Sequence, residues 1–291
     1  MSFSLVVLAG GLGSRFNGNK QIEGLGPNGE FLMEYSIYDA IRIGCSKVIV
    51  LSNHHCIALL EKQLNYLKDQ VELVFVNQYE FDPNFPSYRK RPWGTGHAVL
   101  SCKDYISNSF LLINADDFYG VQSYDKAKEL LLNMERDHYG LVVFELGKTL
   151  SSHGGVSRGI CGVQDDVLIE IEEYIHIERE GDSAFHKSSN TFLDIQSPVS
   201  MNLWILRPSI FDILESTFEE FYQNNKGDDQ REFFLPEVIN KLILNKESLI
   251  QVSKTSSNWF GITYADDLEL CQRQLNIQIQ NGNYPLQLKN D

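Results

Sequence analysis

Apolar runs alternate with amphipathic segments along the first half of the chain. Continuous apolar stretches predict buried strands at 3–8, 48–51, 71–76, 110–113 and 141–146. Between them, residues 35–43, 57–67 and 123–137 carry apolar side chains at helical spacing. Strands that alternate with helices indicate an α/β protein whose central sheet is mostly parallel and is covered by helices on both faces.

The pattern changes at about residue 147. Loops surround an acidic strand expected over 167–178, so we expect residues 147–210 to form a small lobe. Residues 211–275 are expected to supply closing helices and a strand. At 291 residues with 43% hydrophobic side chains, the chain can bury a large core. We therefore expect one domain over 1–275, with 1–146 as its first half, and a C-terminal tail over 276–291.

Composition and charge exclude several classes of protein. The formal net charge is −14, whereas binding to a nucleic-acid backbone needs a basic face, so no nucleic-acid partner is expected. The five cysteines are scattered without a Cys-x-x-Cys pair, which fits a reducing compartment and no zinc site. Neither a secretory signal nor a membrane-spanning segment is visible, so we expect a cytoplasmic protein without a membrane partner.

A glycine-rich segment follows the first predicted strand directly. Residues 8–20 read Leu-Ala-Gly-Gly-Leu-Gly-Ser-Arg-Phe-Asn-Gly-Asn-Lys. Gly10, Gly11 and Gly13 let the backbone turn sharply and bring its N–H groups against an anion, and Arg15 and Lys20 add positive charge. The spacing fits neither a dinucleotide fold nor a P-loop. We expect a bound polyphosphate, which makes 1–146 a nucleotide-binding half; the alternative is a turn that only links a strand to a helix.

An acidic pair, Asp116 and Asp117, follows the strand expected over 110–113. Ligands of open α/β sheets bind outside the carboxyl ends of the strands. Mg²⁺ prefers oxygen ligands and commonly uses one or two protein carboxylates together with phosphates and water. We therefore expect Asp116 to bind Mg²⁺, and Asp117 is free to cap a helix instead.

The loop over 77–94 is long and basic, with Arg89, Lys90 and Arg91 before Trp93. Two interpretations stay open: a solvated surface loop, or a lid whose cations draw a polyphosphate toward an acidic protein. His97 follows in a predicted first helical turn, where we expect a packed histidine rather than a general base. The other histidines lack metal-ligand spacing and a nucleophile partner, so no covalent intermediate is expected.

Several motifs, in this order, resemble those of the sugar-phosphate nucleotidylyltransferases. They are the segment 8–20, Met33-Glu34-Tyr35, Trp93-Gly94-Thr95-Gly96-His97-Ala98, Ile113-Asn114-Ala115-Asp116-Asp117 and Phe234-Leu235-Pro236-Glu237-Val238. The resemblance covers about residues 3–270 and implies a Rossmann-like, GT-A-type fold. It also implies Mg²⁺-dependent transfer of NMP from an NTP to a phosphomonoester, with a sugar 1-phosphate as the expected acceptor and release of pyrophosphate.

The resemblance assigns roles residue by residue. Arg15 and Lys20 would hold the phosphates as catalytic residues, and 147–210 would be the acceptor-binding lobe. The nucleotide would be bound by Leu8, Ala9, Gly10, Gly11, Gly13, Ser14, Gln78, Gly94, Thr95 and Gly96; the acceptor by Gly159, Glu173 and Asn202; and the metal by Asp116 and Asp267. Glu173 also fits a solvated strand edge, and Asn202 a turn that begins a strand.

Two departures from the family pattern limit this assignment. The family's second metal-binding aspartate is here Gly261; either Asp266 or Asp267 replaces it, or one protein carboxylate suffices. The lysine that grips the sugar phosphate is here Tyr174, for which Arg158 or Arg179 is a substitute; this leaves room for another acceptor, such as phosphocholine. A GT-A glycosyltransferase and an inactive nucleotide-binding regulator remain alternatives, and the base, the acceptor and a homo-oligomeric state stay open.

Overall fold

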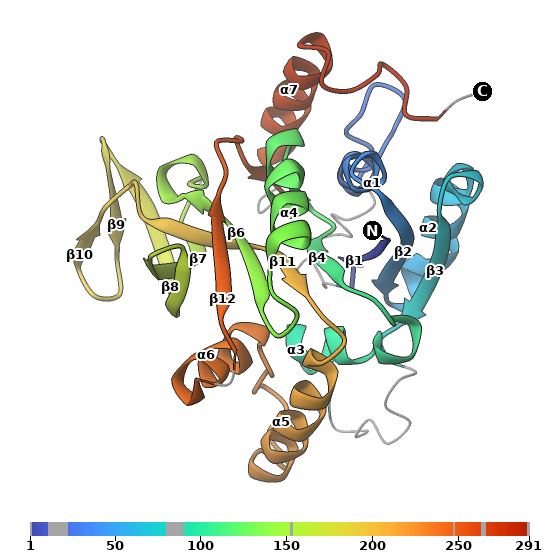
Figure 1. The fold of residues 1–291 in the computed structure, drawn as a ribbon. Helices are drawn as coiled ribbons and strands as arrows, with labels where there is room; N and C mark the ends of the chain where they lie inside the picture. Colours follow the sequence, from blue (N-terminus) through green and yellow to red (C-terminus); the bar gives the residue numbers. More distant parts are fainter. Residues whose placement is uncertain are drawn as a thin grey trace.

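The computed structural model describes residues 2–10, 23–79, 89, 91–151, 154–246, 248–262 and 266–289. Its main strands are β1 (Phe3–Leu8), β2 (Cys45–Ser52), β3 (Glu72–Asn77), β4 (Phe110–Asn114), β6 (Tyr139–Glu145), β7 (Val156–Gln164), β8 (Val167–Glu180), β9 (Ser183–His186), β10 (Thr191–Leu193), β11 (Pro198–Leu206) and β12 (Ile250–Lys254). They form an 11-stranded sheet in the order β10-β9-β8-β12-β6-β11-β4-β1-β2-β3, and β7 pairs with β11 and β8 (Figure 1). The short strands β5 (Asp117–Phe118) and β13 (Phe260–Gly261) pair separately.

One end of the sheet, β4-β1-β2-β3, is parallel. β1 pairs in parallel with β2 and β4, and β3 continues beside β2. β1, β2 and β4 are largely buried because helices cover both of their faces, whereas β3 at the sheet edge is mostly half-buried. β11 is inserted antiparallel between β4 and β6, and β12 pairs in parallel with β6. The predicted Rossmann-like α/β fold is confirmed, and β7 to β10 extend it as an antiparallel lobe.

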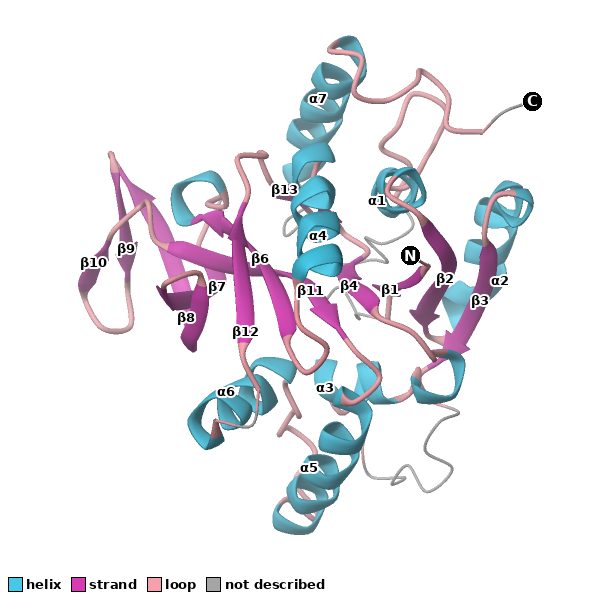
Figure 2. Ribbon diagram, in the orientation of Figure 1, coloured by secondary structure: helices cyan, strands magenta, loops and turns pink. Residues whose placement is uncertain are grey.

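Helices cover both faces of the sheet (Figure 2). Successive side chains of a strand point to opposite faces, so each face packs against its own group of helices. Leu5 and Val7 point toward α1 (Leu32–Arg42), α2 (His54–Leu64) and α4 (Val121–Asn133), whereas Val6 belongs to the core under α3 (Thr95–Leu100), α5 (Ile210–Asn224) and α6 (Leu235–Asn245). Short 3₁₀ helices are η2 (Asn65–Asp69), η3 (Lys103–Tyr105) and η4 (Leu146–Lys148). In the described part of the chain, no helix has the length and apolarity to cross a membrane.

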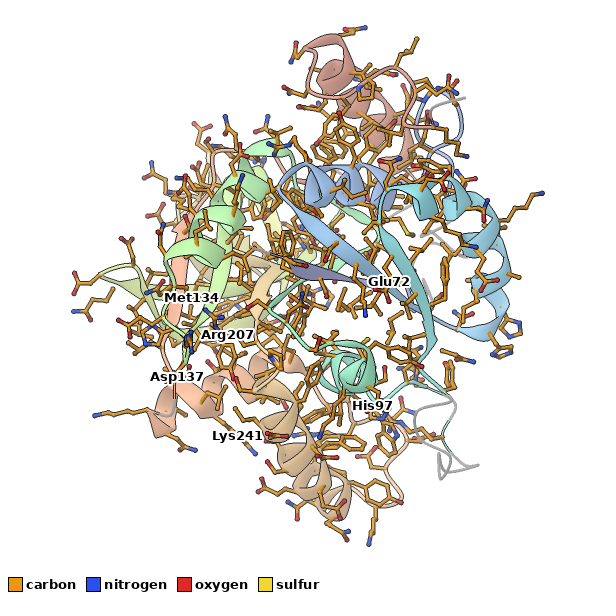
Figure 3. All side chains as sticks on the ribbon, turned by 45° about the vertical axis from the view of Figure 1, so that its right-hand side comes forward. Glu72, His97, Met134, Asp137, Arg207 and Lys241 are labelled. Carbon is orange, nitrogen blue, oxygen red and sulfur yellow. The ribbon has the colours of Figure 1, made fainter. Side chains whose placement is uncertain are left out.

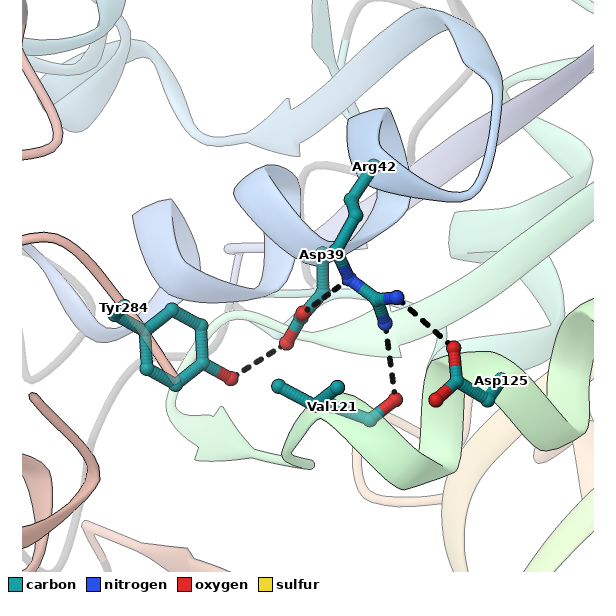
Figure 4. Close-up of polar contacts among 5 residues, drawn as sticks. All are labelled: Asp39, Arg42, Val121, Asp125 and Tyr284. Carbon is teal, nitrogen blue, oxygen red and sulfur yellow. Dashed lines mark hydrogen bonds and ion pairs between the residues drawn. The ribbon is translucent and has the colours of Figure 1, made fainter. Parts of the chain in front are cut away.

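The C-terminal segment after α7 (Asp267–Gln280) is anchored on α1 (Figure 4). Tyr284 donates a hydrogen bond of 2.5 Å to Asp39 Oδ2, and Arg42 Nε lies 3.3 Å from Asp39 Oδ1. The same guanidinium contacts Asp125 at 2.9 Å and the Val121 carbonyl at 3.1 Å. Burial raises the pKa of Asp39 to about 6, although the hydrogen bond from Tyr284 and the charge of Arg42 lower it. The buried carboxylate of Asp39 therefore binds the C-terminal segment to α1, and Arg42 links α1 to α4.

Arg207 closes the sheet edge opposite to the carboxyl ends of β4 and β6. It follows β11 and donates to the carbonyls of His138 and Met134, both at 3.2 Å, and to Glu135 at 3.0 Å. Its remaining nitrogen donates to Ser109 Oγ at 3.0 Å. Figure 3 labels Arg207 beside Met134 on this side. These bonds fix the turn before β6 and leave the opposite edge for a site.

Candidate active site

A cavity of about 710 Å³ opens where the carboxyl end of β4 meets the antiparallel lobe. Its walls come from the end of β4, from β7, β8 and β11, and from the N-terminal turns of α6. Ligands bind at this edge of open α/β sheets. Of the predicted site residues, the cavity brings together Asp116, Gly159, Glu173, Asn202 and Thr95, which come from different elements.

The acidic pair is held by a polar network. Asn114 Nδ2 donates to Asp117 Oδ2 at 2.8 Å, and the buried Tyr119 hydroxyl lies 3.4 Å from the same oxygen. The main-chain N–H of Asn114 donates to the Tyr119 hydroxyl at 3.0 Å, and that hydroxyl donates to the Met201 carbonyl at 2.8 Å. Asp117 is therefore part of β5 and of the cavity wall. The alternative that it caps a helix is wrong, because α4 begins after Gly120.

Asn202 enters the cavity from a bulge in β11. The register between β11 and β6 shifts between Ser200 and Leu203, and Asn202 has φ +62. A bulge re-aims a side chain, and left-handed backbone at a residue other than glycine is costly and clusters at functional sites. Trp204 Nε1 donates to Asn202 Oδ1 at 3.2 Å, and Asn202 Nδ2 lies 3.5 Å from Asn114 Oδ1. These contacts couple the bulge to the network around the acidic pair.

Arg158 places a buried cation in the cavity wall. It donates to Thr149 Oγ1 at 3.1 Å, to the Thr149 carbonyl and to the Ser157 carbonyl at 2.8 Å, and its guanidinium lies 4.7 Å from the centre of the Trp259 ring. Burial lowers its pKa to about 10, and Asp117, Glu173 and Asp267 oppose this shift. Arg158 therefore keeps its charge at neutral pH.

Glu173 lines the same cavity as Arg158. It pairs with Gly159 in the ladder between β7 and β8. Although the cavity mouth opens Glu173 to solvent, desolvation by the surrounding walls raises its pKa and the charge of Arg158 lowers it. A carboxylate and a guanidinium thus lie in the same cavity as the acidic pair.

The segment 94–96 packs against the turn that precedes α6. Gly94 has φ +104, and a Cβ there would lie 2.7 Å from the Phe233 carbonyl oxygen. A Cβ on Gly96 would lie 2.7 Å from the Phe233 ring. The Gly96 N–H donates to the Phe233 carbonyl at 2.9 Å, and Thr95 Oγ1 accepts from the Leu235 N–H at 3.1 Å. Both glycines therefore allow a close approach of two distant segments, and their role in base recognition stays a prediction.

The end of β1 is braced by the neighbouring strands. The Ala9 N–H donates to the Leu51 carbonyl at 2.7 Å, and Ser52 Oγ donates to the Ala9 carbonyl at 3.0 Å. The buried Gln78 amide lies over Gly10, whose carbonyl it reaches at 3.4 Å. Leu8 lies at the last position of β1. Gly11, Gly13, Ser14, Arg15 and Lys20 lie outside the described residues, so the predictions for them are unchanged.

The second predicted metal ligand lies apart from the cavity lining. Asp267 is buried at the first residue of α7 and accepts a hydrogen bond of 3.4 Å from Ser151. Gly261 instead pairs with Asp117 between β13 and β5. A Cβ on Gly261 would lie 2.5 Å from Asp117 Oδ1. Asp117 therefore fills the space beside the glycine that stands in place of the family's aspartate, and the role of Asp267 stays a prediction.

Within the basic segment before Trp93, Arg89 is buried rather than solvated. Arg89 is 4% exposed and donates to the carbonyls of Arg91, Pro92, Asp228 and Arg231. Its guanidinium stacks 3.8 Å from the centre of the Trp93 ring, which packs against Phe218 of α5. Arg89 is thus a structural cation, and Lys90 lies outside the described residues.

His97 is packed, as predicted. Its ring lies 4.7 Å from that of Phe218, inside the core under α3 (Figure 3). Burial and the nearby Arg89 lower its pKa to about 4, so it is neutral at pH 7. An imidazole that is enclosed in the core and does not line the cavity is out of reach of a substrate proton and does not serve as a general base there.

Sequence reasoning missed the part of the cavity wall that comes from α6. Asn240 Oδ1 accepts from the Ile171 N–H at 3.0 Å and clamps α6 to β8. Phe234 and Glu237 enter the cavity wall from the first turn of the same helix. Their motif was visible in the sequence, but nothing in it indicated contact with a strand more than 60 residues earlier.

Comparison with known proteins agrees with this architecture. No family model matches the chain. Over 90 residues it is 31% identical to the "Bifunctional protein GlmU" of Methanocaldococcus jannaschii, an alignment that covers 29% of this chain and 19% of that protein. The inositol-1-phosphate CTP transferase from T. maritima is structurally similar, with a TM-score of 0.64, 15% identity, and coverage of 94% of this chain and 96% of that chain.

Two UDP-glucose pyrophosphorylase structures are similar as well. One, complexed with UDP-glucose, has a TM-score of 0.61 and 17% identity and covers 96% of this chain and 100% of that chain. The other, from Acinetobacter baumanii, has a TM-score of 0.62 and 14% identity and covers 96% of this chain and 94% of that chain. Together with the site geometry, these similarities show that this chain has the fold of the sugar-phosphate nucleotidyltransferases.

Proposed function

We propose that this chain is a nucleotidylyltransferase that transfers NMP from an NTP to a phosphomonoester, with a sugar 1-phosphate as acceptor, and releases pyrophosphate. The observation that carries the proposal is the single cavity in which the acidic pair after β4 meets Arg158, Glu173 and Asn202. The neighbours of the same fold include an inositol-1-phosphate CTP transferase and UDP-glucose pyrophosphorylases, whose names describe reactions of this class.

Asp116 and Asp117 fit a Mg²⁺ ion. Both line the cavity, and carboxylate oxygens are the ligands that Mg²⁺ prefers. Within the described ranges, no three His, Cys, Asp or Glu side chains gather as a metal site, and Mg²⁺ commonly uses only one or two protein carboxylates. A bound Mg²⁺ would neutralise charge on the substrate phosphates. Asp267 remains the alternative second ligand.

The protein's own part in the reaction is to position the substrates. An oxygen of the acceptor phosphate attacks the α-phosphorus in line, and little covalent work falls to the protein. Arg15 and Lys20, in the segment after β1, would hold the phosphates of the nucleotide. Glu173 and Asn202 would bind hydroxyl groups of the acceptor from the lobe.

Arg158 is the residue we assign to the acceptor phosphate in place of the family's lysine. It lines the cavity, whereas Arg179 is exposed and donates to the Gly147 carbonyl. The main-chain and hydroxyl acceptors around Arg158 fix the direction of its guanidinium. A planar guanidinium held in this way suits two oxygens of one phosphate.

Pyrophosphate release tests the proposal. A fixed cation at a developing charge is typically worth about 10²–10³ in kcat, so Arg15→Ala and Lys20→Ala should each lower kcat by about that factor and leave the free energy of unfolding unchanged. Asp116→Asn should abolish metal-dependent turnover. Lys241→Gln, on the exposed face of α6, is the control. Pyrophosphate release without an acceptor, or near-normal turnover in these variants, contradicts the proposal.

A further inference from the structure

A continuous series of hydrogen bonds runs from a buried tryptophan to the acidic pair. Trp204 Nε1 donates to Asn202 Oδ1 at 3.2 Å, and Asn202 Nδ2 donates to Asn114 Oδ1 at 3.5 Å. Asn114 Nδ2 in turn donates to Asp117 Oδ2 at 2.8 Å. The two asparagines and Asp117 line the active-site cavity, whereas Trp204 is fully buried and does not line it. We name this series the amide relay.

The two ends of the amide relay fix the orientation of both amides. An indole N–H is only a donor, and an ionised carboxylate is only an acceptor. Trp204 must therefore face the oxygen of Asn202, and Asp117 must face the nitrogen of Asn114. The remaining atoms, Asn202 Nδ2 and Asn114 Oδ1, are then a donor and an acceptor and meet each other. An amide flipped at either position would place two donors or two acceptors together, which is costly in a buried site.

One hydroxyl holds the main chain on both sides of the amide relay. Tyr119 is fully buried, and its hydroxyl accepts from the Asn114 N–H at 3.0 Å. The same hydroxyl donates to the Met201 carbonyl at 2.8 Å. Met201 lies in the bulge of β11, where the register with β6 shifts. Tyr119 therefore ties the end of β4 to the bulge that carries Asn202.

The amide relay leaves one hydrogen of Asn202 for a ligand. Asn202 Nδ2 carries two hydrogens, and within the described residues only Asn114 accepts one of them. We propose that Trp204 and Asn114 are positioning residues of the active site, which hold Asp117 for a divalent cation and make Asn202 offer an N–H to an oxygen of the acceptor. The cation and the acceptor are those of the proposed function, on which this inference rests.

Nitrogen-15 NMR of the indole groups tests the amide relay without metal or substrate. The Trp204 signal is identified by its loss in Trp204→Phe. Asn202→Gly removes the oxygen that accepts from Trp204, and glycine suits the φ of +62 at this position. We expect the Trp204 indole proton to move upfield in Asn202→Gly. In Asn202→Asp it should stay in place or move downfield, because a carboxylate oxygen is a stronger acceptor. An upfield shift in both variants overturns the assigned orientation of the amide.

Binding of Mn²⁺ alone, followed by electron paramagnetic resonance, tests the positioning of Asp117. Asn114→Leu should weaken Mn²⁺ binding about tenfold, since groups that orient a metal ligand commonly contribute that much. Asn108→Leu is the matched control: this half-buried amide before β4 also makes two hydrogen bonds, with Ser4 and Ser2, and the variant should bind Mn²⁺ like the wild type. Equal weakening in the two variants, or none in Asn114→Leu, overturns the proposal.

A cycle of two variants tests whether Trp204 acts through Asn114. Trp204→Phe should weaken Mn²⁺ binding about fivefold, the typical share of one hydrogen bond. Trp204→Phe/Asn114→Leu should bind Mn²⁺ like Asn114→Leu alone, because members of one network are not additive. Weakening by the product of the two single effects overturns the role of Trp204. No Mn²⁺ binding by the wild type contradicts the metal site of the proposed function, and the indole signals then decide the amide relay by themselves.

Discussion

Gly261→Ala places one methyl group between the acidic pair and the end of the 254–261 segment. The new Cβ would lie 2.5 Å from Asp117 Oδ1, 2.8 Å from Trp259 Cζ2 and 2.9 Å from the Asp116 carbonyl oxygen. All three contacts are shorter than the 3.0 Å below which Cβ atoms are essentially never found. Something in the acidic pair or in β13 must therefore move.

The size of the loss in kcat follows from the hydrogen bonds that hold Asp116 and Asp117 in place. Asp117 is tied to Asn114 at 2.8 Å, and the Asp116 carbonyl accepts from the Ile262 N–H at 3.1 Å. Overpacking of this kind costs about 1–3 kcal/mol of stability. Misplacing a reacting group by about 1 Å costs about 10² in rate. We expect Gly261→Ala to lose about that factor in kcat and only a modest part of the free energy of unfolding.

The assay measures kcat from pyrophosphate release and the free energy of unfolding from urea denaturation, on the same preparations of each variant. Gly282→Ala is the matched control. Its φ is +77 and its Cβ would meet nothing within 4 Å, so it should cost about 1–2 kcal/mol through backbone strain alone and leave kcat unchanged. Wild-type kcat in Gly261→Ala, or an equal loss in Gly282→Ala, would refute the geometric reasoning.

Three further predictions concern residues away from the acidic pair. Asp39 has a folded-state pKa of about 6 against an ordinary value of 3.8, so the folded state binds more protons and the free energy of unfolding should fall by about 2 kcal/mol as pH rises from 4 to 6; urea unfolding of Asp39→Asn should lack this slope, and an unchanged slope would contradict the assignment. Arg89→Gln leaves buried carbonyls without their donor and should cost about 2–3 kcal/mol without raising the KM for NTP, whereas a raised KM would restore the lid. Gly94→Ala, whose Cβ would lie 2.7 Å from the Phe233 carbonyl oxygen, should lower the thermal midpoint, and a wild-type midpoint would show that α3 and α6 separate freely.

Local signals in the sequence predict the strands and the place of the acidic pair. The run 3–8 coincides with β1 because continuous burial on both faces needs continuous apolar residues. The helix expected from residue 35 begins at Leu32 instead, because Glu34 accepts a hydrogen bond from the Phe31 N–H at 2.7 Å and starts the helix earlier.

Contacts between distant segments could not be predicted. Gly94 and Gly96 looked like ligand-contacting glycines, yet their small size also serves the approach of Phe233. The bulge that aims Asn202 depends on pairing between β11 and β6, which no local pattern encodes. Two of the four carbonyls that accept hydrogen bonds from Arg89 belong to Asp228 and Arg231. Because these residues are far away in the sequence, the basic run around Arg89 did not indicate that its side chain is buried.

The central claim is that this cavity joins an NMP group to a phosphorylated acceptor. The most direct test mixes the protein with each of the four NTPs and a panel of sugar 1-phosphates and phosphocholine in the presence of Mg²⁺, and measures pyrophosphate and the mass of the product together. The account predicts one NTP and one acceptor that yield an NDP-linked product and pyrophosphate in equal amounts. Absence of an NDP-linked product for every pair, with the nucleotide bound but intact, would contradict it.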